Sequence, residues 1–194
     1  MIKEMHNIES RIIELETRMD AVMQLSRNVI RIAGKLVMAI HSRDWKQADS
    51  LISSLNEYMK QLKLKESGFE HYSLQAHQEY AEAMIVNSII RKGLSVPSMR
   101  ELGESEIPYL LGMMDAVGEL KREAFESMRK GDIASASRYY SIMLEIYDST
   151  VHFRFASSLV PDFRKKQDTA RIQIEGTISE LVSIEGKKTK PDSK

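Results

Sequence analysis

One apolar series constrains the fold of this chain more than any other feature. Between Ile8 and Ile40, apolar side chains recur at alternating steps of four and three residues, which is the heptad spacing of a helix with one buried seam. Ser26 is the single break in the series. The series consists of Ile8, Ile12, Leu15, Met19, Val22, Val29, Ala33, Leu36 and Ile40. It predicts one long N-terminal helix, and a seam of this length predicts that the chain is not a monomer.

The rest of the chain continues in helical periods separated by capping and breaking residues. No strand pattern and no internal repeat is present in the sequence. The expected helical segments are residues 44–68, 69–91, 97–102, 105–130, 132–147 and a last helix that follows Pro161. The expected N-caps are Asp44, Ser105 and Asp132, and Gly131 is expected to end the segment 105–130. The sequence therefore predicts an all-α fold in a single domain, residues 1–184, followed by a charged, disordered tail, residues 185–194.

Composition limits the function classes. The chain has 194 residues, of which 42% are hydrophobic and 29% are charged, as in a folded α-rich domain. It contains no Cys, which excludes thiolate zinc sites, iron–sulfur clusters and thiol catalysis and fits a reducing cytoplasm. No apolar run reaches the roughly 18 residues that a membrane-spanning helix needs, so no membrane partner is expected. The formal net charge is +0, so nucleic-acid binding would depend on local basic patches.

Four carboxylates form two pairs on predicted helices. Glu79 and Glu82 are spaced i,i+3, and Asp115 and Glu119 are spaced i,i+4, so each pair shares one helix face and repels itself unless a cation intervenes. The stripe that should face inward on the third helix also includes Glu79, at a position where an apolar residue is expected. These acids are therefore a candidate metal site. The competing interpretation is a structural salt bridge to Arg122, three residues after Glu119.

Four stretches of the chain together resemble the family of translin and translin-associated factor X, in particular its single-subunit archaeal members. The stretches are residues 25–35, 78–83, 109–120 and 164–171. The resemblance implies an antiparallel helical bundle of about seven helices with a long N-terminal helix. It also implies a hollow homo-oligomer, usually an octamer, that binds single-stranded RNA or DNA. In the catalytic branch of the family, acids at matching positions bind Mg²⁺ and cut RNA, whereas the translin branch mainly binds and scaffolds.

The resemblance carries over residue by residue for the acids. Glu79 and Glu82 match the glutamates of the family motif Gln-Glu-Tyr-x-Glu-Ala, and Asp115 and Glu119 match its motif Asp-x-x-Gly-Glu. All four are expected to be catalytic and to bind Mg²⁺, or Mn²⁺ in its place. Some catalytic members carry a further acid one turn before the first motif, where this chain has Ala76.

Two basic groups are candidate nucleic-acid contacts. Arg27, Arg31 and Lys35 follow one helix face at i, i+4 and i+8, in a region that the resemblance associates with nucleic acid. The alternative for this group is a solvated helix flank. The second group is denser, but Asp162 and Asp168 lie within it and favour structural pairing along the helix. It consists of Arg164, Lys165, Lys166 and Arg171.

These observations lead to one functional hypothesis and two rivals. The hypothesis is a cytoplasmic homo-oligomer that binds single-stranded nucleic acid and hydrolyses RNA as a Mg²⁺-dependent endoribonuclease. The first rival is a non-catalytic scaffold of the translin type. The second is a carboxylate-bridged di-iron bundle, which would need Glu-x-x-His pairs that the acidic segments lack.

Overall fold

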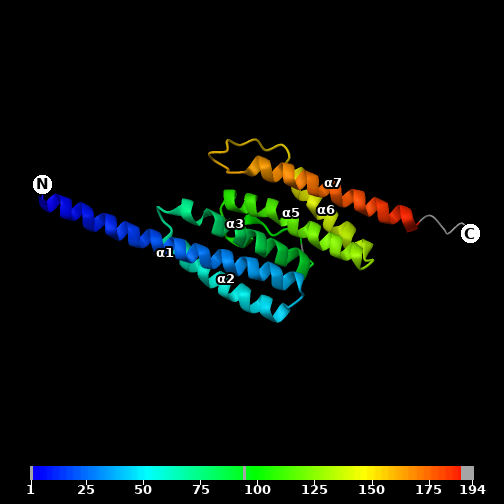
Figure 1. Ribbon diagram of the computed structural model, residues 1–194, viewed down its shortest axis with the longest axis horizontal. Coiled ribbons are helices and arrows are strands. Elements are labelled where there is room, and N and C mark those ends of the chain that lie inside the picture. The colour runs from blue at the N-terminus through cyan, green and yellow to red at the C-terminus, as the bar shows by residue number, and fades with distance from the viewer. Residues whose placement is uncertain (1, 94, 189–194) are drawn as a thin grey trace, which may run out of the picture. The chain divides into compact units, whose positions relative to one another are not determined.

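The structure is a computed structural model that describes residues 2–93 and 95–188 (Figure 1). Within these residues it contains seven α-helices, one π-helical turn and no strand, so the predicted all-α fold is confirmed. No described helix combines the length and apolarity needed to cross a bilayer. In chain order the elements are α1 (Ile2–His41), α2 (Trp45–Lys65), α3 (Glu70–Val86), η1 (Asn87–Arg91), α4 (Met99–Leu102), α5 (Glu106–Arg129), α6 (Ile133–Thr150) and α7 (Phe163–Lys188).

Contacts divide the chain into two compact units, Met1–Ala83 and Met84–Lys194. The single domain expected for residues 1–184 stays a prediction. The last helix, α7, continues to Lys188, which is four residues into the expected disordered tail. The remainder of that tail, residues 189–194, lies outside the described residues.

The first unit is built on an antiparallel pair, α1 and α2 (Figure 1). Asp44 starts α2 as predicted, because its carboxylate accepts a hydrogen bond of 3.0 Å from the backbone N–H of Gln47. Only the C-terminal half of the α1 seam is covered, and the N-terminal half is exposed. The buried side chains of the pair include Val22, Val29, Ala33, Leu36 and Ile40 from α1 and Ala48, Leu55, Met59 and Leu62 from α2.

In the second unit, α5, α6 and α7 pack against one another in pairs. Local signals set the helix ends much as predicted. Ser98 and Glu101 form a reciprocal capping box on α4, and Asp132 caps α6 through the backbone N–H of Ser135 at 3.0 Å. Gly131, with a φ of 77°, separates α5 from α6. The core of the unit includes Leu111, Leu120, Met143, Ile146, Ala170 and Ile174.

Candidate metal and nucleic-acid site

The first acidic pair lies on α3, in the first unit. Glu79 and Glu82 are half-buried, while Ala76 and Ala83, one turn away from Glu79 on either side, are fully buried. The predicted inward stripe of α3 is therefore real around Glu79, although Tyr72 at its start is 39% exposed.

Two hydrogen-bonded side chains next to this pair fix α3 against α2 and its C-cap. His77 donates from Nε2 to the carboxylate of Glu66 at 2.8 Å, and Tyr80 donates to Oδ1 of Asn56 at 3.1 Å. The hydroxyl of Ser73 also donates to Glu66, at 2.5 Å. Burial alone would raise the pKa of Glu66, but the hydrogen bonds from His77 and Ser73 outweigh it and lower that pKa. His77 precedes Glu79 in the sequence and Tyr80 follows it. Their hydrogen bonds therefore fix the rotation of α3 about its axis at the position of its two acids.

The second acidic pair lies on α5, in the second unit, and has cationic neighbours. Lys166 of α7 lies 2.5 Å from Oδ1 of Asp115, and both side chains are about three-quarters buried. They border a cavity of about 270 Å³ whose lining also includes Lys165, Thr169 and Gln173. Arg122 lies 3.8 Å from Glu119, but its side chain is 60% exposed, so this contact contributes little. Of these two contacts, the one with Lys166 is therefore shorter and more buried than the one with Arg122.

Gly118 lies where the side chain of Gln173 on α7 meets α5. A Cβ added at Gly118 would lie 3.3 Å from Nε2 of Gln173, which is tighter than an ordinary contact. Glycine costs a helix roughly 1 kcal/mol relative to alanine, and here it leaves room for the Gln173 side chain. The glycine between Asp115 and Glu119 thus marks a helix contact, as its place between two acids suggests.

The chemistry of the four acids suits a hard divalent cation, because Mg²⁺ prefers carboxylate oxygens and needs few of them. Each unit holds one pair. Among the described residues, no group of three or more His, Asp and Glu side chains is gathered so that it could hold a metal ion. The assignment of Glu79, Glu82, Asp115 and Glu119 to one metal site therefore stays a prediction.

The basic residues of α1 lie where a ligand could reach them. Arg27, Arg31 and Lys35 are exposed. Arg27 donates to the carbonyl of Met23 at 3.3 Å, and Arg31 donates to Oδ1 of Asn28, also at 3.3 Å. These are contacts within one helix, so the face remains open, and its role in nucleic-acid binding stays a prediction.

The second basic group behaves differently from the sequence expectation. The intrahelical pairs expected with Asp162 and Asp168 do not form in the described part of the chain. Lys166 contacts Asp115 instead, and Arg171 pairs with Glu175 at 3.0 Å. Arg164 and Lys165 are exposed, and neither forms an ion pair with a described residue.

Sequence reasoning missed the contact between Lys166 and Asp115, because helical spacing rules reach only four residues and these two lie 51 positions apart. One signal was available. Three consecutive cations, Arg164 to Lys166, open α7 at the end where the helix dipole disfavours positive charge. Such a run suggests that at least one of them has a partner elsewhere.

Comparisons with known proteins agree on one family. The sequence model described as "Translin family" matches residues 1–176. A relative from Methanocaldococcus jannaschii, the uncharacterized protein MJ0175, is 31% identical over 171 residues, which cover 85% of this chain and 75% of that protein.

Solved structures show the same likeness. The crystal structure of AfC3PO is similar with a TM-score of 0.86 and 28% identity, covering 96% of this chain and 100% of that one. The structure of AfC3PO in a complex with duplex RNA gives a TM-score of 0.86 at 25% identity, covering 97% and 100%. Apo-NeC3PO gives 0.85 at 23% identity, covering 95% and 98%, which is a likeness of fold alone.

Proposed function

The chain belongs to the translin family, and we propose that it binds single-stranded nucleic acid and hydrolyses RNA with Mg²⁺ as part of a homo-oligomer. The observation that carries the proposal is the intact set of four acids, in which both motifs of the catalytic branch are complete on α3 and α5. The AfC3PO complex with duplex RNA supports RNA as the ligand class. The absence of cysteine fits a cytoplasmic setting.

In this proposal Glu79, Glu82, Asp115 and Glu119 hold Mg²⁺, or Mn²⁺ in its place. An ion held there would act as a Lewis acid, which would lower the pKa of a bound water and offset charge on the phosphate. Lys166 balances the charge of Asp115 and keeps that carboxylate on the α7 side of α5. The buried Glu66 and His77 pair holds α3 in the rotation that presents Glu79.

The test of catalysis is cleavage of single-stranded RNA by Glu82→Gln and Asp115→Asn, with Mg²⁺ or with EDTA. Each substitution removes a charged ligand and nearly preserves shape, so we expect cleavage to fall by about 100-fold or more. Asp148→Asn is the matched control, since Asp148 is an exposed acid on α6. Full activity of either site variant, or of the wild type in EDTA, contradicts the nuclease proposal.

Stability separates the metal site from a structural salt bridge. Glu82→Gln relieves like-charge repulsion with Glu79, so the thermal midpoint of the metal-free variant should stay constant or rise. A structural ion pair predicts a fall instead. If the wild type binds RNA tightly and cleaves neither single-stranded nor duplex RNA, the protein is a scaffold of the translin type.

Binding should depend on the basic face of α1. Replacing Arg27, Arg31 and Lys35 by Gln should weaken binding to single strands and flatten its dependence on salt, by roughly 0.7 in the logarithmic slope per lost phosphate contact. The control replaces three exposed lysines of α2, Lys46, Lys60 and Lys65. Unchanged affinity and slope in the α1 variant would make this face a solvated flank.

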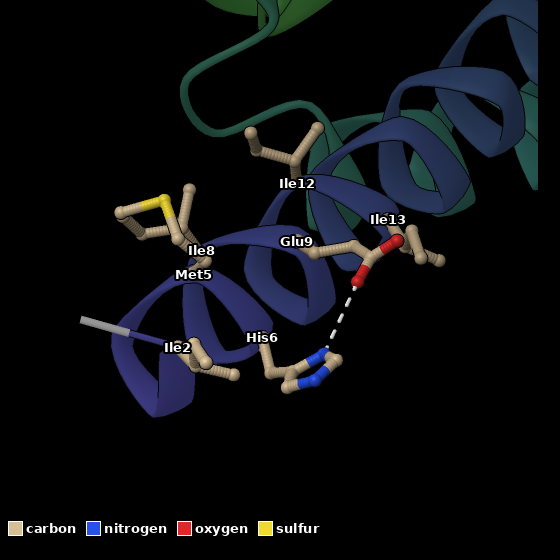
Figure 2. Close-up of a pocket in the computed structure, with 7 residues that line it drawn as sticks. All are labelled: Ile2, Met5, His6, Ile8, Glu9, Ile12 and Ile13. Atoms are coloured by element: carbon tan, nitrogen blue, oxygen red, sulfur yellow. Dashed lines mark ion pairs between the residues drawn. The ribbon is translucent and has the colours of Figure 1, made fainter.

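The exposed half of α1 supports self-association. Figure 2 shows Met5, Ile8 and Ile12 projecting from one side of the helix, away from the ion pair between His6 and Glu9. Ile8 and Ile12 are 44% and 58% exposed although they belong to the heptad seam. We propose that a second copy of this chain covers them and that the family's octamer is the assembly. Light scattering that reports a 22.2 kDa particle at every concentration contradicts this.

A further inference from the structure

The segment between α6 and α7 carries two exposed phenyl rings on a fixed base. Phe153 is 40% exposed and Phe155 is 46% exposed, with ring centroids 5.5 Å apart. Both rings approach Phe163, which is only 4% exposed, at 6.4 Å and 5.6 Å. The buried ring therefore supports two others that keep a large part of their surface in solvent.

Hydrogen bonds hold this segment in shape. The guanidinium of Arg154, between the two phenylalanines, donates to the carbonyls of Val151 and Phe153 at 2.7 Å and 2.6 Å. The amide of the buried Gln167 donates to the carbonyl of Thr150 at 2.7 Å, which joins the second turn of α7 to the end of α6. The rings are thus presented by a closed and internally bonded loop.

Two cations that form no ion pair with a described residue follow the buried ring in the chain. Arg164 and Lys165 directly follow Phe163 at the start of α7, where the helix dipole adds positive potential. Together with Phe163 they line a cavity of about 430 Å³. Asp162 and Asp168 line the same cavity, but neither pairs with the two cations among the described residues. Phe163 thus contacts the two exposed rings and also lines the cavity of the two cations. Aromatic faces and cations are the two elements that single-strand binding surfaces combine.

We propose that Phe153 and Phe155 stack on unpaired nucleobases of a single strand whose phosphates contact Arg164 and Lys165. The site rests on the proposed nucleic-acid binding, but it requires no cleavage and no metal. It would also make the protein selective, since the bases of a duplex are already stacked and paired and cannot reach the rings. A second copy of this chain would cover an apolar patch equally well, but it would give no reason for two cations that follow Phe163 and form no ion pair with a described residue.

The experiment compares an RNA strand with a strand of equal length and charge that lacks bases. Stacking contributes roughly 5- to 150-fold per base in other proteins, so the wild type should prefer the strand with bases by about tenfold or more. Phe153→Leu/Phe155→Leu keeps apolar bulk and removes the rings, and should bring the preference close to one without changing the salt dependence. Arg164→Gln/Lys165→Gln should weaken both strands equally and flatten the salt dependence.

Phe125→Leu is the matched control. Phe125 is 39% exposed on α5, and the ammonium of Lys121 lies 5.5 Å from its ring centre, so it is an exposed phenylalanine beside a cation outside the site. It should keep the full preference for bases. Phe155→Leu alone, which leaves Phe153 on Phe163, should lose part of the preference and guards against misfolding of the double variant.

Three results overturn the proposal. The first is that the wild type binds both strands equally, and the second is that the double leucine variant keeps its preference for bases. The third is that Phe153→Ala/Phe155→Ala lowers the particle mass while the leucine pair does not, because this result would identify the rings as an interface between copies. If the wild type binds no nucleic acid at all, the proposed function fails together with this site. Binding without a preference for bases defeats this site alone.

Discussion

The two halves of α1 follow one heptad spacing but have opposite surroundings. Val29, Leu36 and Ile40 in the second half are fully buried, whereas Ile8 and Ile12 in the first half are about half exposed. Length explains the difference, because α1 has 40 residues and α2 has 21, which correspond to about 60 Å and about 31 Å of helix. The pattern thus predicts that a seam is covered, but does not say whether the cover comes from the same chain.

The largest expected effect is on assembly. Replacing Ile8, Ile12 and Leu15 by Ser should reduce the particle to the 22.2 kDa of one chain while the helical signal persists, because these side chains are 44%, 58% and 48% exposed and add little to packing among the described residues. Sedimentation or light scattering measures the mass. The control replaces Met38 and Leu64, which are 67% and 77% exposed and lie outside the seam. An unchanged mass in the seam variant would show that the exposed half takes no part in assembly.

The second prediction concerns stability. In the assembly-deficient background, Leu36→Ala should lower the free energy of unfolding by about 3 kcal/mol, because it opens a cavity at a fully buried site. Ile12→Ala, in a background that keeps Ser at positions 8 and 15, should change the free energy of unfolding by only about 0.5 kcal/mol. Urea unfolding compares the two. Equal costs would mean that the first half is packed within its own chain.

Two histidine–glutamate pairs, the largely buried His77–Glu66 and the exposed His6–Glu9, should differ in how they change stability with pH. The hydrogen bonds from His77 and Ser73 lower the pKa of Glu66 against the effect of burial, so its stabilisation is present above pH 4.5, its ordinary pKa, and is lost as pH falls through the lower folded value. Glu66→Gln should cost about 1 to 2 kcal/mol at neutral pH and flatten the loss of stability below pH 4.5. Glu9→Gln should change neither, because Glu9 and His6 are 68% and 74% exposed. Urea unfolding between pH 3 and 7 checks this, and parallel pH curves for Glu66→Gln and the wild type would refute it.

The smallest effect is expected at the break in the seam. Ser26 is 4% exposed, and its hydroxyl has no hydrogen-bond partner among the described residues, so Ser26→Ala should raise stability by about 1 kcal/mol. Ser53→Ala on α2 is the control, since it gains the same helix propensity at an exposed site whose hydroxyl donates to Asp49. If both variants gain equally, the buried hydroxyl carries no penalty.

Local chemistry made most helix limits predictable. Asp44 and Asp132 cap the helices expected of them, and Gly131 stops α5, because each acts within four residues. Ser105 shows the limit of such rules, since it occupies the cap position without a side-chain hydrogen bond. The π-helical turn from Asn87 to Arg91 replaces the expected last turns of the third helix, and no spacing rule signals it.

In the candidate site, too, local features could be predicted from the sequence and contacts between helices could not. Spacing alone gave the two acidic pairs. It could not give Lys166 as the partner of Asp115 or the packing of Phe153 and Phe155 on Phe163, because these contacts depend on how α5, α6 and α7 pack together.

The hydrogen bond from Gln167 to Thr150 has a consequence for how this protein can diverge. This hydrogen bond ties α6 to α7 at the two ends of the segment 151–162. The packing of the two helices therefore offsets the conformational entropy lost in closing the loop. Closure entropy grows slowly with length, by roughly 0.6 kcal/mol per doubling. Residues added near Ser158, beyond the two rings, would therefore leave the fold almost unaffected. Related chains can therefore vary in the length of this loop without rebuilding the bundle.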